Sequence, residues 1–272
     1  MSDISKQSLV HPTAVIDSGA KLGAGVRVGA YSVIGGNVSL GDNVQIYPHV
    51  VIEGRTEIGV GTQIFPFASI GMQPQDLKYQ GELSSLEIGA NNIIREHVTM
   101  NPGTEGGGMV TRVGNNCLFM VGAHIAHDCD VGNHAIFANN ATLAGHVIVE
   151  DYAVLGGLSA VHQFVRIGRH SMVGGMSGVE HDVIPYGSVL GNRARLAGLN
   201  IVGLRRRKFS RGEIADLRKA YRLLFAEEGS MAERVNDASE MYKDNRAVMD
   251  IVEFIRVDSS RSICQPRTEH GG

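Results

Sequence analysis

The stretch from Val28 to Ile46, VGAYSVIGGNVSLGDNVQI, decides the fold, because an aliphatic residue returns in it at every sixth position. The same spacing extends in both directions. It gives an unbroken aliphatic series made of Val10, Ile16, Leu22, Val28, Ile34, Leu40, Ile46, Ile52, Ile58, Ile64 and Ile70. A period of six fits neither an α-helix nor an alternating strand. It predicts a parallel β-helix in which three hexads form one 18-residue coil and the aliphatic residues stack in the core.

Two segments interrupt this repeat. The segment 71–87, GMQPQDLKYQGELSSLE, preserves the 18-residue phase and could be one degenerate coil, but Pro74 and the charges favour a loop that leaves the β-helix. The segment 100–112, MNPGTEGGGMVTR, breaks the phase, and its three consecutive glycines predict a flexible loop. The repeat then returns at Val113 and continues to Val179.

The composition changes after the repeat, which predicts a β-helix over residues 1–192 and a helical domain over residues 193–272. The segment 193–211 carries seven basic residues and no acidic one. Ser210 with Glu213, and Ser230 with Glu233, have the spacing of capping boxes at helix starts. A third helix is expected over residues 248–255, followed by a mobile polar tail that includes His270.

Composition and charge exclude several classes of protein. The 272 residues are 43% hydrophobic, which suits a globular protein with a buried core, and the net charge of -3 argues against a general nucleic-acid binder. No segment has the length and apolar content of a membrane span, and the N-terminus has no signal-peptide pattern, so the chain is expected in the cytoplasm. The three cysteines stand in no CxxC pair and are expected as reduced thiols.

The 18-residue register also predicts which polar residues meet. Positions 18 apart lie in adjacent coils, separated by about 4.8 Å. One column therefore contains His127, Gly145 and Gln163, and the next contains Asp128, His146 and Phe164. His162 is on the same face. The polar side chains are therefore expected in one patch made of His127, Asp128, His146, His162 and Gln163.

This patch suits general-base chemistry. An imidazole has an ordinary pKa of about 6.5, near working pH, and a carboxylate beside it can fix its tautomer and stabilise the charge that it gains. His127 and Asp128 supply both groups, and the Gly145 N–H, which no side chain shields, could stabilise an oxyanion. A zinc hydro-lyase site is the chemical alternative, since histidines of adjacent coils can bind Zn²⁺.

Other histidines of the β-helix and two of the cysteines are expected to have structural roles. His11, His49, His97 and His134 fit the turns of a β-helix. Cys117 and Cys129 occupy the small inward position of their hexads, where packing is a better explanation than catalysis.

Several motifs together resemble the bacterial UDP-N-acetylglucosamine O-acyltransferases that begin lipid A synthesis. Besides the hexads, they are QDLKY at 75–79, AHIAHDC at 123–129, NNATLAGH at 139–146, AVHQF at 160–164 and GLRRRKFSR at 203–211. The resemblance implies a left-handed β-helix and a homotrimer with active sites between neighbouring subunits. It also implies transfer of an (R)-3-hydroxyacyl chain from acyl carrier protein to the glucosamine 3-hydroxyl of UDP-N-acetylglucosamine, without a metal or another cofactor.

The resemblance assigns roles to individual positions. His127 matches the general base, Asp128 its supporting carboxylate and Gly145 the oxyanion amide. Substrate contacts are implied for a longer set: Asp76, Lys78, His124, His146, His162, Gln163, Asn200, Arg206 and Arg207. Gly174 and Gly175 match a position that measures the acyl chain, and because glycine leaves a groove open, a chain of more than about ten carbons is expected. The basic run 205–208 would attract an acidic carrier protein.

Two departures keep other functions open. The family often shows HRGT where this chain has MNPGT, and an acidic nucleotide contact of some members is replaced at Val202. A related N-acyltransferase, or one that acylates a 3-amino sugar nucleotide, could use the same base. A trimeric scaffold without catalysis is the non-enzymatic alternative.

Overall fold

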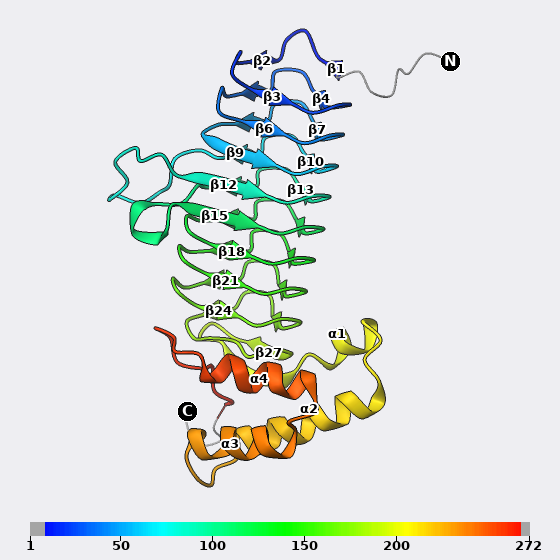
Figure 1. Ribbon diagram of the computed structural model, residues 1–272, viewed down its shortest axis with the longest axis vertical. Helices are drawn as coiled ribbons and strands as arrows, with labels where there is room; N and C mark the ends of the chain where they lie inside the picture. Colours follow the sequence, from blue (N-terminus) through cyan, green and yellow to red (C-terminus); the bar gives the residue numbers. More distant parts are fainter. Residues whose placement is uncertain (1–8, 268–272) are drawn as a thin grey trace.

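The computed structural model describes residues 9–267, and in it the chain winds into three sheets that form the walls of a long prism (Figure 1). Wall A contains β1 (Leu9–Val10), β4 (Arg27–Val28), β7 (Gln45–Ile46), β10 (Gln63–Ile64), β13 (Ile93–Ile94), β16 (Leu118–Phe119), β19 (Ile136–Phe137), β22 (Val154–Leu155), β25 (Met172–Val173), β27 (Gly187–Leu190) and the antiparallel β28 (Arg195–Leu199). Wall B contains β2 (Val15–Ile16), β5 (Val33–Ile34), β8 (Val51–Ile52), β11 (Ser69–Ile70), β14 (Thr99–Met100), β17 (His124–Ile125), β20 (Thr142–Leu143), β23 (Ala160–Val161) and β26 (Gly178–Val179). Wall C contains β3 (Lys21–Leu22), β6 (Ser39–Leu40), β9 (Arg55–Ile58), β12 (Ser85–Ile88), β15 (Val110–Val113), β18 (Asp130–Val131), β21 (Ile148–Val149) and β24 (Arg166–Ile167).

The predicted 18-residue register is confirmed by the strand pairing. Ile34 is paired with Ile52, and Leu143 with Val161. The side chains of Ile52 and Leu143 have no exposed surface, so the aliphatic column forms the core. Val10 is 43% exposed because the first coil has no neighbour on its outer side within the described residues.

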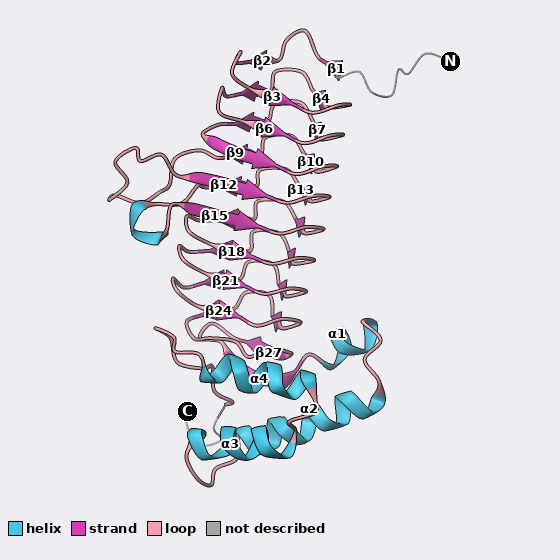
Figure 2. Cartoon of the chain, viewed as in Figure 1, coloured by secondary structure: helices cyan, strands magenta, loops and turns pink. Residues whose placement is uncertain are grey.

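The two interruptions of the repeat are loops (Figure 2). Ile70 pairs directly with Met100, so no degenerate coil lies between them. The first loop ends before residue 85, earlier than expected, because Ser85–Ile88 pairs with wall C on both sides. The second loop runs from the end of β14 at Met100 to the start of β15 at Val110 and contains one 3₁₀ turn, η2 (Glu105–Gly107).

Four helices cover the C-terminal end of the prism (Figure 1): α1 (Ile201–Arg206), α2 (Arg211–Leu224), α3 (Met231–Met241) and α4 (Arg246–Arg256). Both predicted capping boxes are present, at Ser210 with Glu213 and at Ser230 with Glu233. The domain boundary between residues 192 and 193 stays a prediction. Strand β28, which belongs to wall A, lies on the C-terminal side of this boundary. None of the helices in the described part of the chain has the length and apolar content needed to cross a bilayer.

The tail is attached to the prism as far as the structure describes it, so the expectation of a mobile tail is wrong up to residue 267. Asp182 forms a bridge with Ile263, and Leu196 forms one with Pro266. The buried Asp182 carboxylate also accepts a hydrogen bond from the Ser259 hydroxyl at 2.8 Å. His270 lies outside the described residues.

Candidate active site

His127 and Asp128 lie in the turn between β17 and β18, at the edge where walls B and C meet. Asp128 adopts a left-handed conformation with φ of 58°, which is unfavourable for a residue with a side chain. Its main-chain N–H donates to the Thr111 hydroxyl at 2.7 Å, and this bond helps to hold the turn. The tight turn directs both side chains to the outside of the same edge.

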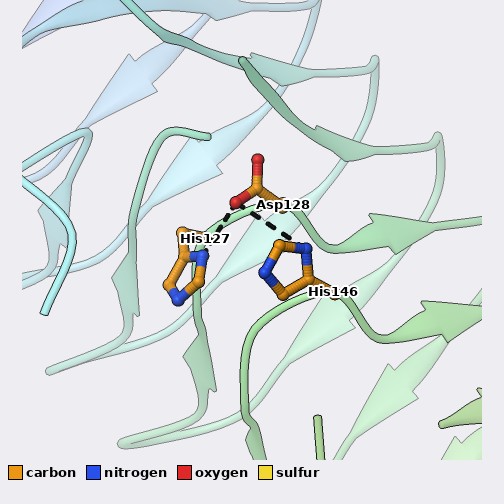
Figure 3. A group of neighbouring side chains, drawn as sticks. All are labelled: His127, Asp128 and His146. Atoms are coloured by element: carbon orange, nitrogen blue, oxygen red, sulfur yellow. Dashed lines mark hydrogen bonds and ion pairs between the residues drawn. The ribbon is translucent and has the colours of Figure 1, made fainter. Parts of the chain in front are cut away.

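The imidazole of His127 is joined to the carboxylate of Asp128, and we refer to the two residues as the dyad (Figure 3). Nδ1 of His127 lies 2.8 Å from Oδ2 of Asp128. A carboxylate only accepts, so Nδ1 carries the proton and Nε2 has a free lone pair. The dyad therefore has the form of a general base with an orienting carboxylate.

The register places Gly145 against the ring of His127. A Cβ atom at position 145 would lie 2.5 Å from Cε1 and 2.6 Å from Nε2 of His127, so only glycine fits here. Within residues 9–267 the Gly145 N–H donates no hydrogen bond. A free amide beside Nε2 can stabilise negative charge on an oxygen that reacts there.

Two further histidines lie next to the dyad. The ring of His146 contacts the ring of His127 edge-on, with centroids 5.0 Å apart (Figure 3). On its other side the His146 ring stacks on Phe164. Nδ1 of His124 lies 2.7 Å from the Thr99 hydroxyl. Burial lowers the pKa of both His124 and His146, and for His146 this effect outweighs the charge of Asp128, which raises the pKa. Both rings are therefore neutral at pH 7 and can donate or accept hydrogen bonds.

The first loop and the next coil contribute the remaining polar groups at this edge. The first loop carries Asp76 and Lys78, whose charges act on His146. His162 and Gln163 follow β23 and are exposed. The predicted patch therefore forms within one chain.

The predicted nucleotide contacts on α1 lie on another edge of the prism. The Arg207 guanidinium donates to the Tyr152 carbonyl at 2.9 Å, and Tyr152 lies where wall C meets wall A. Asn200 caps α1 by accepting from the Gly203 N–H at 3.0 Å and donates to the His170 carbonyl at 2.9 Å. Arg206 is exposed. One chain therefore does not bring this group to His127.

The two predicted ruler glycines lie on the third edge, between β25 and β26. A Cβ atom at Gly175 would meet only main-chain atoms of Gly157, the nearer of them at 3.3 Å, whereas a side chain at Gly174 would collide with Leu190. A side chain introduced at position 175 would therefore project outward.

Comparisons with known proteins agree with this geometry. Residues 182–264 match the family described as UDP-N-acetylglucosamine O-acyltransferase, domain 2, and residues 111–145 match the bacterial transferase hexapeptide family. The acyl-[acyl-carrier-protein]–UDP-N-acetylglucosamine O-acyltransferase of Rickettsia canadensis is 55% identical over 94% of this chain and 97% of its own. The chain belongs to this acyltransferase family.

Further relatives of the acyltransferase support the assignment. The enzyme of the same name from Methylobacterium radiotolerans is 68% identical over 74% of each chain. The crystal structure of Francisella novicida UDP-N-acetylglucosamine acyltransferase superposes with a TM-score of 0.92, at 37% identity over 96% of this chain and 95% of that one. The predicted fold class, a left-handed parallel β-helix with a C-terminal helical region, is confirmed.

The polar patch of the acyltransferase has partners that the sequence does not predict. The Asp128 carboxylate has no exposed surface, and it accepts from the Thr104 N–H at 2.8 Å and from the Thr104 hydroxyl at 2.6 Å. Arg261 donates to Nδ1 of His162 at 2.8 Å and to the Gln163 carbonyl at 3.0 Å. Thr104 stands in the quoted MNPGT motif, but no sequence signal links Arg261 to a histidine 99 residues earlier.

The same residues bear on the zinc alternative. One ligand atom each from His127, Asp128 and His146 lie within 4.8 Å of one another, close enough for a metal ion. Both oxygens of Asp128 are, however, already bound by Thr104, and Oδ2 also accepts from His127. A metal ion would have to break this arrangement, which favours the hydrogen-bonded dyad.

The cysteines take no part in this site. Cys117, Cys129 and Cys264 are free and buried. Burial raises the pKa of Cys117 to about 11 and the pKa of Cys129 to about 12, so neither is a thiolate at neutral pH.

Proposed function

We propose that this protein transfers an (R)-3-hydroxyacyl chain from acyl carrier protein to the glucosamine 3-hydroxyl of UDP-N-acetylglucosamine, the first step of lipid A biosynthesis. The family membership supports acyl-carrier-protein-dependent acylation of this sugar nucleotide. The observation that carries the chemistry is the dyad, whose Nε2 faces away from the carboxylate with its lone pair free.

In this mechanism Nε2 of His127 removes the proton from the 3-hydroxyl as the oxygen attacks the thioester carbonyl. Asp128 stabilises the imidazolium that forms. The Gly145 N–H donates to the oxyanion of the tetrahedral intermediate. The tetrahedral intermediate then collapses with cleavage of its C–S bond, and the imidazolium of His127 gives its proton to the thiolate of the carrier protein as it leaves. Proton transfer of this kind contributes about 10²–10⁴-fold to a rate.

The sugar nucleotide is held by groups from two copies of the chain. Asp76, Lys78, His124 and His146 surround the dyad in one copy, and His162 and Gln163 extend the patch by one coil. Asn200, Arg206 and Arg207 come from the neighbouring copy of a homotrimer, because they lie on a different edge of the same chain. The guanidinium groups of Arg206 and Arg207 bind the diphosphate, since planar donors fit phosphate oxygens.

The carrier protein docks at the start of the helical region. Arg205, Arg211 and Arg218 line a hollow of about 570 Å³ together with Phe209, Ile214 and Ala215. Acyl carrier proteins are acidic, and a basic surface steers an acidic partner. The acyl chain runs along the prism towards Gly175. No metal or other cofactor is needed, and the reaction takes place in the cytoplasm.

The decisive experiment measures acyl transfer by the wild type and by His127→Ala. The acceptors are UDP-N-acetylglucosamine and its 3-amino analogue, and the donors are carrier-protein thioesters of different lengths. We expect turnover with the hydroxyl acceptor and a loss of at least about 10²-fold in His127→Ala. Full activity of the variant would refute the mechanism. A preference for the amine would favour the N-acyltransferase alternative. Zinc bound to the purified protein, together with no acyl transfer to either acceptor, would favour the hydro-lyase.

A further inference from the structure

The second loop closes over the carboxylate of the dyad. Thr104 stands 24 residues before Asp128 and binds both of its oxygens, the main-chain N–H to Oδ1 at 2.8 Å and the hydroxyl to Oδ2 at 2.6 Å. Thr104 is 5% exposed, and the Asp128 side chain is completely buried. The carboxylate is therefore shielded from water by a loop that leaves the repeat.

The glycines of this loop allow the close approach. A Cβ atom at Gly103 would lie 2.8 Å from Oδ1 of Asp128, and one at Gly107 would overlap the carboxylate. The loop is also tied to β12, because the Gly103 N–H donates to the Ser85 carbonyl at 3.2 Å and the Ser85 N–H donates to the Met109 carbonyl at 2.8 Å. These glycines therefore allow the loop to turn and also allow it to pack directly against the carboxylate of Asp128.

Oδ2 of Asp128 has two donors, the Thr104 hydroxyl and Nδ1 of His127. Because Thr104 holds both oxygens, it fixes the plane of the carboxylate and aims Oδ2 at the imidazole. We propose that Thr104 is a positioning residue of the acyltransferase, which acts through Asp128 to orient His127 and to moderate the carboxylate's hold on the imidazolium. This role rests on the proposed function of His127 as the base.

The moderating effect has a definite sign. A hydroxyl that donates to Oδ2 withdraws negative charge from it, so without this bond the carboxylate attracts the imidazolium more strongly. Loss of this bond therefore strengthens the ion pair between Asp128 and the imidazolium that forms during the reaction. Among the described residues, His124 and His146 lie beside the dyad and the charges of Asp76 and Lys78 act on His146, and a substitution at position 104 removes none of these four groups.

The test uses Thr104→Val, which removes the hydroxyl but keeps the shape and the main-chain N–H. We expect kcat at pH 7 to fall about tenfold, the effect of one hydrogen bond to a charged group. The acidic limb of the pH–activity profile should move to higher pH, and the KM for UDP-N-acetylglucosamine should change less than kcat. Thr104→Ser, which keeps the hydroxyl, should restore both the rate and the pH profile.

The matched control is Thr111→Val. It removes a buried hydroxyl that also binds Asp128, but at the main-chain N–H. We expect a lower Tm and an acidic limb that stays at the wild-type pH. Two results, each with an inactive His127→Ala, would overturn the positioning role alone. One is an equal shift of the acidic limb in Thr111→Val, and the other is a wild-type rate and pH profile in Thr104→Val. Full activity of His127→Ala would overturn the base assignment and the positioning role with it.

Discussion

A single methyl group added at position 145 would collide with the base. In Gly145→Ala the new Cβ atom would lie within 2.6 Å of Nε2 and 2.5 Å of Cε1 of His127, so the ring must turn away from its position. We expect kcat to fall by about 10²-fold, because small displacements of catalytic groups cost that much. Steady-state assays check this against Gly178→Ala, whose Cβ atom would meet its nearest neighbour, the Asn192 carbonyl, at 3.3 Å. Equal rates in the two variants would contradict the predicted contact.

His170 is a second residue whose surroundings predict a measurable property. Its ring stacks between Tyr152 and Tyr186, with centroids 4.8 and 5.5 Å away, and its buried Nδ1 has no hydrogen-bond partner among the described residues. Burial lowers its pKa from 6.5 to about 4, and the nearby charges of Arg207 and Arg169 add to the effect. Below about pH 6.5, His170 therefore binds a proton in the unfolded chain but stays neutral in the folded chain.

The free energy of unfolding should accordingly decrease as the pH falls from about 6.5 towards 4. From pH 7 to pH 5 the contribution of this residue is about 2 kcal/mol. His170→Phe keeps a flat ring in the stack and should remove that part of the pH dependence. Urea unfolding of both proteins at pH 7 and pH 5, at one protein concentration, measures the difference. Identical slopes against pH would show that another group is responsible.

At the scale of the elements, the regular spacing of coils makes the acyl-chain groove testable. Gly157 and Gly175 stand 18 residues apart at the turns after β22 and β25, and a Cβ atom at either position would have its nearest neighbour at 3.3 Å. Gly175→Met should shift the donor preference to shorter acyl chains. Gly157→Met lies one coil nearer to His127 and should shorten the preferred chain further, by roughly the methylene groups that span ~4.8 Å.

Competition assays with a ladder of carrier-protein thioesters measure this order. Wild type should prefer chains of more than about ten carbons, because neither glycine obstructs a groove. Equal preferences in the wild type and both variants would exclude this edge as the path of the chain. A wild-type preference for short chains would refute the long-chain proposal.

The elements differ in how much of them could be predicted from sequence. Because the hexads repeat, the 18-residue register alone predicts that His127 lies beside Gly145 and that Asp128 lies beside His146. The sequence also predicts the helix starts at Ser210 and Ser230, because a capping box involves only residues close together in the chain. The contacts of Thr104 and Arg261 are neither periodic nor local. The glycines of the second loop predict a flexible loop. In the structure two of them, Gly103 and Gly107, instead leave the space that the carboxylate of Asp128 occupies.

At the scale of the whole molecule, the separation of functional groups over two edges of the prism points to assembly. His127 lies where wall B meets wall C, and α1 is attached where wall C meets wall A, through Arg207 and Tyr152. A site that needs both groups is incomplete in one chain. A cyclic trimer would place the α1 of one copy beside the dyad of the next.

Mixed trimers test this arrangement directly. His127→Ala and Arg206→Ala should each be nearly inactive as homotrimers, since each removes a required group from every site. If the two variants are co-expressed and assemble at random, about a quarter of the sites in a three-fold ring receive an intact His127 from one copy and an intact Arg206 from its neighbour. Activity should therefore return to about a quarter of the wild-type level, and a wild-type mixture carried through the same preparation gives the reference. If both groups of a site came from the same chain, every site would contain one substitution and no activity would return.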